Sequence, residues 1–233
     1  EIYTLSLHDA LPIYELTDYF GKEGMIVIAN PNAPTGLALS KDEIEEILKN
    51  ARSAIVIIDE AYVDFGAEST ADLIPKYDNL IVVGTFSKSR SMAGIRIGYA
   101  LGQESLISDL HRIKYSFNPY SLDGLAVLAG KASVEDREYF ESTTKMVIKT
   151  RENFIKELKT LGFEVFDSKA NFVFTKNDII SGEELYKQLR ENNILVRYFD
   201  ENVLRDYVRI SIGSDENMEY TADVLRGIIG NRG

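Results

Sequence analysis

Short apolar runs alternate with amphipathic stretches along the first half of the chain. Three of these runs contain almost no polar residue, and they are MIVIAN (25–30), AIVIID (54–59) and LIVVGTF (80–86). Runs of this length and composition are typical of parallel strands that are buried on both faces. The stretches between them have room for helices, so the pattern predicts a doubly wound α/β sheet.

A helix and a fourth strand complete this first half. Ser40 and Glu43 have the spacing of a capping box and predict a helix that runs to about Asn50. The run IRIGYALG (95–102) is the fourth predicted strand, and its two later glycines mark close approaches or the end of the strand.

The pattern changes beyond residue 102. Residues 103–133 are predicted to be helical with an interruption at Pro119, because proline breaks a helix. A long helix is predicted over 134–161, and two further helices over 181–192 and 214–229. Four short strands are expected among them, at FEVFD (163–167), NFVFT (171–175), ILVRYF (194–199) and YVRISI (207–212). This second half therefore reads as a compact α+β unit.

The predicted domains follow this change of pattern. We expect a partial large domain over residues 14–133, a connecting helix over 134–162 and a small carboxy-terminal α+β domain over 163–233. Residues 1–13, EIYTLSLHDALPI, resemble the conceptual translation of a sequencing-library adapter, so we interpret them as an artefact. The alternative is a native β-strand and turn.

Composition and charge narrow the possible chemistry. The chain has 233 residues, 45% of them hydrophobic, with 26 basic and 37 acidic side chains and a formal net charge of −11. This acidic balance disfavours nucleic acid as a partner. The absence of cysteine excludes thiolate metal sites, and with His8 and His111 as its two histidines the chain disfavours a histidine zinc site and a Ser-His-Asp triad. These counts lead us to expect no metal ion. No apolar run is long enough to cross a membrane, and we expect a cytoplasmic protein.

Candidate functional residues stand where the predicted strands end. In doubly wound sheets, ligands bind beyond the carboxyl ends of the strands. Asp59 ends the second run, and a carboxylate there is costly unless it has a partner. Lys88 follows the third run, and its primary amine can form a Schiff base with an aldehyde. The simpler alternatives are a structural or helix-capping aspartate and a surface lysine.

Six motifs lie in order along the chain. They are NPNAPTG (30–36), DEAYVDFG (59–66), TFSKSRSMAGIRIGY (85–99), KANFVF (169–174), LVRYF (195–199) and YVRISIGSDEN (207–217). Together they resemble the fold-type I pyridoxal-phosphate aminotransferases, and within that family they are most similar to the histidinol-phosphate aminotransferases. Each motif alone is weak evidence, but six in the same order are specific, and the resemblance covers essentially all of residues 25–230.

The resemblance implies a site for pyridoxal 5′-phosphate. Lys88 matches the lysine that holds this cofactor and later moves the α-proton of the substrate. Asp59 matches the partner of the pyridine nitrogen, which makes the ring an electron sink. Tyr62 matches a tyrosine that bonds to the ring oxygen, with a half-buried aromatic as its alternative. Hydroxyls and a guanidinium suit a phosphate, and the ligands implied for it are Thr85, Ser87 and Arg96.

The resemblance also implies a substrate site in the second half of the chain. Arg209, in the alternating strand YVRISI, matches the arginine that binds the substrate α-carboxylate, and its apolar neighbours point to the opposite face. Arg197 matches a second substrate arginine, and Asn171 matches a residue that lines the site. The alternatives are strand arginines in solvated ion pairs, a turn asparagine and, for Thr85, an ordinary β-branched strand residue.

Two residues depart from the family pattern or stand out within it. Related enzymes have asparagine where Ala33 stands, so a bond to the cofactor ring oxygen is missing or comes from Tyr62 alone. Arg90, two residues after Lys88, is interpreted as a solvated loop charge, with a phosphate contact as the alternative. The family's phosphate loop, stacking aromatic and amino-terminal arm have no counterpart in residues 14–24, so we expect an amino-terminally truncated fragment.

The implied reaction is transamination of histidinol phosphate with 2-oxoglutarate, giving imidazole acetol phosphate and glutamate in histidine biosynthesis. The implied enzyme is a homodimer when full length. Another aminotransferase or a decarboxylase of an amino-acid phosphate is the alternative within the fold. A nucleotide hydrolase is a remote alternative, because AIVIIDEA resembles a Walker B strand but GxxxxGK[ST] does not occur. A non-catalytic binding module is the third possibility, since fold does not fix function.

Overall fold

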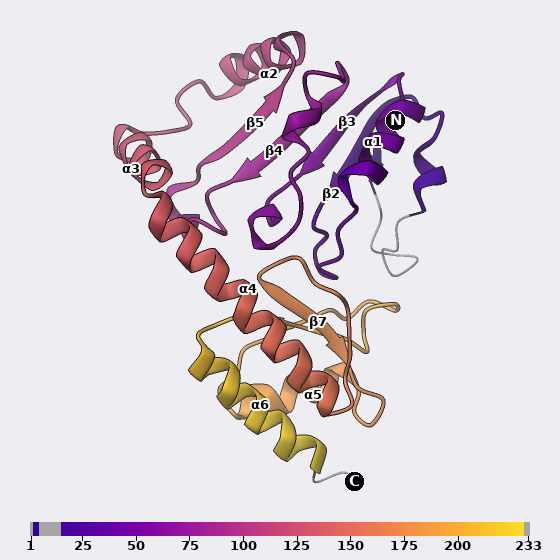
Figure 1. Cartoon of the computed structure of the whole chain (residues 1–233), viewed down its shortest axis with the longest axis vertical. Coiled ribbons are helices and arrows are strands. Elements are labelled where there is room, and N and C mark those ends of the chain that lie inside the picture. The colour runs from indigo at the N-terminus through magenta and orange to yellow at the C-terminus, as the bar shows by residue number, and fades with distance from the viewer. Residues whose placement is uncertain (1, 5–14, 231–233) are drawn as a thin grey trace. The chain divides into compact units, whose positions relative to one another are not determined.

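The computed structural model describes residues 2–4 and 15–230, which form two compact units (Figure 1). The first unit contains residues 2–4, 15–31 and 38–143, and the second contains residues 32–37 and 144–230. Each unit has its own sheet and its own apolar core. No helix among the described residues is long and apolar enough to span a membrane.

The first unit is built on a five-stranded sheet with the order β1-β2-β3-β4-β5. The strands are β1 (Ile2–Thr4), β2 (Gly24–Ala29), β3 (Ala54–Asp59), β4 (Leu80–Thr85) and β5 (Gly98–Gly102). The first four are parallel and β5 is antiparallel to β4 (Figure 1), which confirms the predicted α/β class. Asp59 lies opposite Ala29 on one side and Val83 on the other, so the carboxyl ends of β2, β3 and β4 meet at one edge.

The amino-terminal end of the chain is only partly described. Residues 2–4 pair with β2 as strand β1, whereas residues 5–14 lie outside the described residues. The artificial origin of residues 1–13 therefore stays a prediction.

The strands β2, β3 and β4 bury mainly one of their faces, whereas the sequence predicted burial on both faces. Helix α1 (Lys41–Asn50) packs on that face, and its Ile44 and Ile47 share an apolar cluster with Val56 and Ile58 of β3. Residues on the other face, such as Ile57, are half-buried. The reason is that this cluster, which α1 forms with the short 3-10 helices η1 (Leu16–Tyr19) and η3 (Ala71–Leu73), occupies one side of the strands.

The predicted capping box begins α1. Ser40 Oγ accepts a hydrogen bond from Glu43 N at 3.3 Å, and Glu43 Oε2 accepts one from Ser40 N at 2.7 Å. These reciprocal bonds satisfy two backbone N–H groups at the start of the helix, so this prediction is confirmed.

Three helices follow β5, namely α2 (Glu104–Phe117), α3 (Gly124–Glu135) and α4 (Arg137–Thr160). The predicted interruption at Pro119 lies between α2 and α3. The predicted continuous helix from residue 134 is wrong at its start, because α3 ends at Glu135 and a new helix begins after Asp136. Asp136 Oδ1 accepts a hydrogen bond from Tyr139 N at 3.2 Å, which is the bond of a helix N-cap.

The second unit contains a four-stranded antiparallel sheet with the order β6-β7-β9-β8. Its strands are β6 (Glu164–Val165), β7 (Phe172–Lys176), β8 (Arg197–Tyr198) and β9 (Val208–Ser211), and its helices after α4 are α5 (Gly182–Glu191) and α6 (Asp215–Gly230). Strands β6 and β8 are shorter than the runs that predicted them. The α+β class predicted for this region is confirmed.

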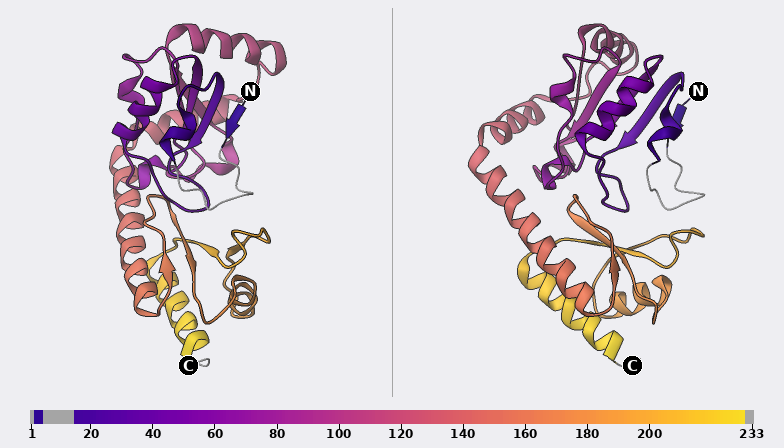
Figure 2. Two further views of the ribbon diagram at one scale, coloured as in Figure 1. Left: turned by 90° about the vertical axis from the view of Figure 1, so that its right-hand side faces the viewer. Right: turned by 45° about the vertical axis from the view of Figure 1, so that its right-hand side comes forward.

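The two faces of this second sheet differ in character. Val173, Val208 and Ile210 point to the face covered by helices, where they pack with residues such as Leu158 of α4 and Leu225 of α6. Helices α4 and α6 run side by side there (Figure 2). On the other face, Phe174 stacks on Tyr207 with ring centroids 4.7 Å apart. Arg209 shares that aromatic face because the side chains of adjacent strand residues alternate.

Candidate active site

The first group of predicted site residues lies at the carboxyl edge of the five-stranded sheet. Asp59 is the last residue of β3 and is half-buried. Its Oδ1 accepts a hydrogen bond from Ala61 N at 3.0 Å, and its main-chain carbonyl accepts one from Asn30 N at 2.8 Å. The loops that leave β2 and β3 are thus joined at the position of this carboxylate.

The neighbouring carboxylate, Glu60, has a different role. It is 4% exposed, and its two oxygens accept hydrogen bonds from Ser69 Oγ at 2.7 Å, Thr70 N at 2.6 Å and Thr70 Oγ1 at 2.8 Å. These bonds fix the loop that follows β3. In a Walker B strand the acidic pair serves the nucleotide site, and here the second acid is committed to the protein, which weakens the hydrolase alternative.

Lys88 and Tyr62 come together from two different loops. Lys88 follows β4, whereas Tyr62 precedes the 3-10 helix η2 (Val63–Phe65). The ammonium Nζ lies 5.2 Å from the centroid of the Tyr62 ring, within the range of a cation–π contact. Lys88 is exposed, so an aldehyde in solution has access to its amine.

The hydroxyls predicted to bind phosphate form one turn at the end of β4. Thr85 Oγ1 bonds to Ser87 Oγ at 2.9 Å and accepts a hydrogen bond from Ser87 N at 3.0 Å. Thr85 Oγ1 also lies 3.3 Å from the carbonyl oxygen of Ile97, the residue after Arg96. This turn brings both hydroxyls beside the segment that carries the predicted arginine.

Arg96 ends the 3-10 helix η4 (Ala93–Ile95) in a left-handed conformation with φ of 63°. It is exposed, and its Nη1 donates to the carbonyl of Ala93 at 3.0 Å. Its side chain also lines a cavity of about 510 Å³ beside β5, together with Tyr99 and His111. No ion pair involves Arg96 among the described residues, which leaves its charge available to an anion.

Tyr99 of β5 borders this region. Its ring lies over Gly84 of β4, where a Cβ would come within 2.3 Å of the ring, so a larger residue at position 84 would displace it. Partial burial raises the pKa of the Tyr99 phenol, and the nearby carboxylates of Asp64 and Glu60 raise it further.

Arg90 is neither solvated nor an evident phosphate ligand, which corrects its sequence interpretation. The side chain is half-buried, and Nη1 donates to the carbonyl of Ser133 in α3 at 2.5 Å. The guanidinium lies 4.0 Å from the ring centroid of Phe140 and 5.6 Å from that of Phe86. No local pattern predicts this contact, because Ser133 is 43 residues away.

The predicted substrate residues belong to the second unit. Arg209 of β9 and Arg197 of β8 lie directly opposite each other in an antiparallel pair, so both side chains stand on the aromatic face. Arg209 is half-buried with its Cζ 4.9 Å from the centroid of Phe172, and its buried Nε has no hydrogen-bond partner among the described residues. Asn171 precedes β7, and its carbonyl accepts a hydrogen bond from Ile212 N at 2.9 Å.

The first motif makes close contacts within the same unit. A Cβ on Gly36 would lie 2.3 Å from Ser168 Oγ, and Gly36 has φ of +78°, so only glycine fits there without strain. The carbonyl of Gly36 accepts a hydrogen bond from Lys169 N at 2.7 Å. This contact joins the motif to the turn just before Asn171.

Both asparagines of the first motif are committed to its loop. Asn30 bonds to the main chain of Leu39 through both ends of its amide, at 2.7 and 3.1 Å. Asn32 Oδ1 accepts from Thr35 Oγ1 at 2.9 Å. These side chains hold the turn around Ala33, so neither is a ready substitute for the asparagine that related enzymes have at that position.

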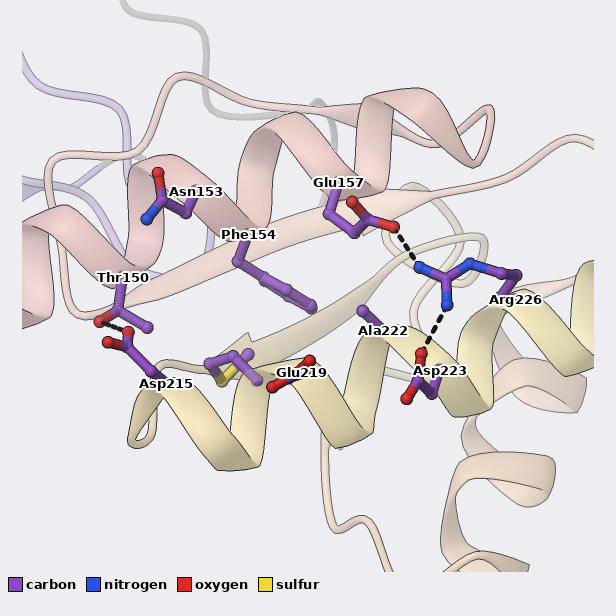
Figure 3. A pocket seen from close by; sticks show the side chains of 10 residues that line it. Thr150, Asn153, Phe154, Glu157, Asp215, Glu219, Ala222, Asp223 and Arg226 are labelled. Carbon is purple, nitrogen blue, oxygen red and sulfur yellow. Dashed lines mark hydrogen bonds and ion pairs between the residues drawn. The ribbon is translucent and has the colours of Figure 1, made fainter.

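A separate pocket of about 400 Å³ lies between α4 and α6 (Figure 3). In this pocket, Arg226 bonds to both Glu157 and Asp223 at 2.5 Å, and Asp215 accepts a hydrogen bond from Thr150. It contains none of the predicted site residues. Among the described residues, no cluster of three or more acidic or histidine side chains could hold a metal ion.

The two groups of site residues thus lie in different units. Residues 7–225 match the family of class I and II aminotransferases, and the chain belongs to that family. It is 50% identical over 218 residues to the histidinol-phosphate aminotransferase of Brachyspira hyodysenteriae, a match that covers 93% of this chain and 62% of that protein.

Solved structures agree with this assignment. The histidinol-phosphate aminotransferase from Clostridium acetobutylicum superposes with a TM-score of 0.82 at 31% identity, over 89% of this chain and 64% of that one. The L-threonine-O-3-phosphate decarboxylase from Porphyromonas gingivalis superposes with a TM-score of 0.72 at 25% identity, over 89% of this chain and 65% of that one. The chain therefore spans about 62% of the curated relative's length.

Proposed function

We propose that this chain is part of an enzyme that transfers an amino group from histidinol phosphate to 2-oxoglutarate with pyridoxal 5′-phosphate as cofactor. The observation that carries the proposal is the meeting of Lys88 and Tyr62 at the sheet edge formed by Asp59 and Thr85. An exposed amine over a tyrosine ring, at the carboxyl ends of two adjacent parallel strands, is suited to binding an aldehyde cofactor.

The chemistry of the side chains fits this cofactor group by group. Asp59 offers a half-buried carboxylate, and among the described residues only one of its oxygens has a hydrogen-bond donor, Ala61 N. That leaves Oδ2 for the protonated pyridine nitrogen. Thr85, Ser87 and Arg96 offer the phosphate two hydroxyls and a guanidinium that forms no ion pair among the described residues.

When bound, pyridoxal phosphate supplies an aldehyde that condenses with amines and a ring that accepts electrons from the substrate. In this proposal Lys88 Nζ takes the proton from the substrate α-carbon, and it gives a proton back later in the transfer of the amino group. Asp59 keeps a proton on the ring nitrogen, and Tyr62 donates its hydroxyl proton toward the ring oxygen. Ala33 cannot contribute there, so Tyr62 carries that contact alone.

The opposed arginines support an anionic substrate. Two like charges directly opposite each other on adjacent strands are unfavourable unless an anion lies between or beside them. The buried Nε of Arg209, without a partner among the described residues, adds a donor that a ligand can satisfy. Histidinol phosphate carries a phosphate, and 2-oxoglutarate carries two carboxylates, so one pair of arginines can serve both half-reactions.

The choice of histidinol phosphate rests on the relatives, since identity to a histidinol-phosphate aminotransferase reaches 50%. Because the chain spans about 62% of that relative, the complete activity belongs to the full-length enzyme. We propose that this enzyme is a cytoplasmic homodimer. The fold alone does not separate it from a decarboxylase of an amino-acid phosphate, because one such structure also superposes on this chain.

The role of Lys88 is tested by reduction with borohydride in the presence of pyridoxal phosphate, followed by peptide mass mapping. We expect the cofactor on the Lys88 peptide and its loss in Lys88→Arg. Lys131→Arg is the matched control, because Lys131 is an exposed lysine of α3 paired with Glu135. Modification spread over surface lysines with an unmodified Lys88 peptide would contradict the proposal.

The choice of reaction is tested separately on substrate binding and products. We expect histidinol phosphate to bind this chain and Arg209→Gln to weaken that binding by about tenfold or more, since a charge-assisted contact is lost. In the completed enzyme, glutamate should form from 2-oxoglutarate. Release of carbon dioxide from an amino-acid phosphate, without glutamate, would favour the decarboxylase instead.

A further inference from the structure

In the loop that carries Lys88, the residues before and after this lysine are attached to the rest of the protein. Among residues 84–90, Lys88 alone is exposed, and Ser89 beside it is 8% exposed. The first two residues of the loop are fixed by the turn at the end of β4, through the bonds between Thr85 and Ser87. The two residues after Lys88 have separate attachments, which the family motifs did not predict.

The first attachment joins the loop to η2. Ser89 Oγ donates a hydrogen bond to Asp64 Oδ2 at 2.5 Å. Asp64 lies in η2, two residues after Tyr62, so the bond attaches the residue after Lys88 to the short turn that Tyr62 precedes. Because the acceptor is a carboxylate, this is a charge-assisted bond of the stronger kind.

The second attachment joins the loop to the end of α3. The carbonyl of Ser133 lies in the last turn of that helix, where carbonyls have no partner within the helix and the helix dipole is negative. Arg90 donates to it at 2.5 Å, and its flat guanidinium lies over Phe140 at 4.0 Å from the centroid. A guanidinium can stack and donate at the same time, whereas a lysine ammonium can do so only poorly.

We propose that Arg90 and Ser89 are positioning residues that hold Lys88 over the Tyr62 ring. They attach the loop to two different elements, η2 and α3. The main chain at Lys88 is thereby held in one conformation, while its side chain stays free to react. The inference rests on the proposed role of Lys88, and it assigns to Arg90 a task in place of the solvated or phosphate-binding roles. Neither residue touches the reacting groups.

The test begins without cofactor, on this chain as it stands. Lysines are converted to ¹³C-dimethyl-lysines, and the Lys88 resonance is identified by its absence in Lys88→Arg. A methylated amine 5.2 Å from an aromatic centroid has a ring-current shift, which Tyr62→Leu removes. We expect Arg90→Gln and Ser89→Ala to reduce this shift by about half or more, because a loop that loses an anchor samples several conformations.

The matched control is Arg112→Gln, which removes an exposed arginine that pairs with Asp109 on its own helix. It should leave the Lys88 resonance unchanged. Arg90→Lys keeps the charge without the flat stacking surface, so we expect a value between those of wild type and Arg90→Gln. Ser89→Ala removes a single hydroxyl, so it keeps the test decisive if Arg90→Gln does not fold.

The second readout is the rate at which borohydride fixes pyridoxal phosphate to Lys88. We expect about a tenfold loss in Arg90→Gln, since small misplacements of a reacting group cost one to two orders of magnitude. A lower melting temperature with an unchanged Lys88 resonance and an unchanged fixation rate would overturn the inference and show a purely structural role. Failure of the wild type to fix the cofactor would instead count against the proposed function, while the resonance would still report the positioning.

Discussion

The two compact units differ in how completely they bury their apolar side chains. In the second unit, helices α4, α5 and α6 close over one face of the sheet and leave a continuous apolar cluster. In the first unit, β5, α2 and α3 leave a band of apolar side chains in contact with solvent. Of the seventeen large hydrophobic side chains exposed in the described part of the chain, thirteen lie between residues 99 and 139.

Two leucines illustrate this difference between the units. Leu158 in α4 is 0% exposed and Leu128 in α3 is 65% exposed, although both occupy apolar positions of a helix. An apolar residue in a helical pattern therefore does not by itself identify a core. What separates the two positions is the sheet behind Leu158, which becomes visible only in the tertiary structure.

The largest loss of stability is expected at Leu158, and its absence would contradict the difference between the two units. Leu158→Ala should lower the free energy of unfolding by about 3 kcal/mol, because it leaves a cavity in a closed core. Leu128→Ala removes the same atoms from an exposed position and should change stability by less than about 0.5 kcal/mol. Urea unfolding of both variants measures the difference, and equal losses would mean that Leu128 is also part of a core.

A second comparison concerns glycines with positive φ in each unit. Gly36→Ala should cost about 2 kcal/mol or more, because the new Cβ would meet Ser168 Oγ at 2.3 Å in a conformation already unfavourable for alanine. Gly21 has φ of +67° with no atom within 4 Å of the position of a Cβ, so Gly21→Ala should cost about 1 kcal/mol from the backbone alone. A smaller loss for Gly36→Ala than for Gly21→Ala would show that the contact with Ser168 is not tight.

The smallest effect appears only at high pH and tests the core of the first unit. Burial raises the pKa of Tyr19 to about 12, with a further contribution from Asp18, and its buried hydroxyl has no partner among the described residues. The unfolded chain loses this proton near pH 10 while the folded chain keeps it, so the stability is present below pH 10 and is lost as the pH rises toward 12. Tyr19→Phe lacks this loss.

The difference in unfolding free energy between Tyr19→Phe and wild type should therefore shift in favour of the variant by about 1 kcal/mol between pH 9 and pH 11. Chemical unfolding at a series of pH values measures it. A constant difference across this range would mean that Tyr19 ionises in the folded chain as readily as in the unfolded one. Below pH 9, the variant should be more stable than wild type by about 1 kcal/mol, since a buried hydroxyl without a partner costs desolvation free energy.

The features predicted correctly from the sequence are those with a local cause. The capping box at Ser40 needs only residues three apart, and the break at Pro119 needs only one residue. The alternation around Arg209 correctly placed its neighbours Val208 and Ile210 in the core. The start of α4 was missed because the helical pattern continues through Asp136, although an aspartate three residues before Tyr139 is a recognisable cap.

The features that were missed depend on residues far apart in the chain. No local pattern links Arg90 to Ser133, or Gly36 to Ser168, since these contacts exist only after the loops are folded. Glu60 could not be distinguished from Asp59 by position, and the bonds from Ser69 and Thr70 are what give it a structural task. The opposed arginines likewise depend on the register between β8 and β9, which short strands do not encode strongly.

The exposed apolar band also affects how the protein behaves in the laboratory. A net charge of −11 keeps copies apart at low ionic strength, but added salt screens that repulsion and strengthens apolar association. The chain should therefore bind hydrophobic chromatography resins and fluorescent dyes such as ANS through residues like Phe117 and Tyr120, which are about nine-tenths exposed. Preparations at low salt, or with a mild detergent that covers these rings, suit this surface best.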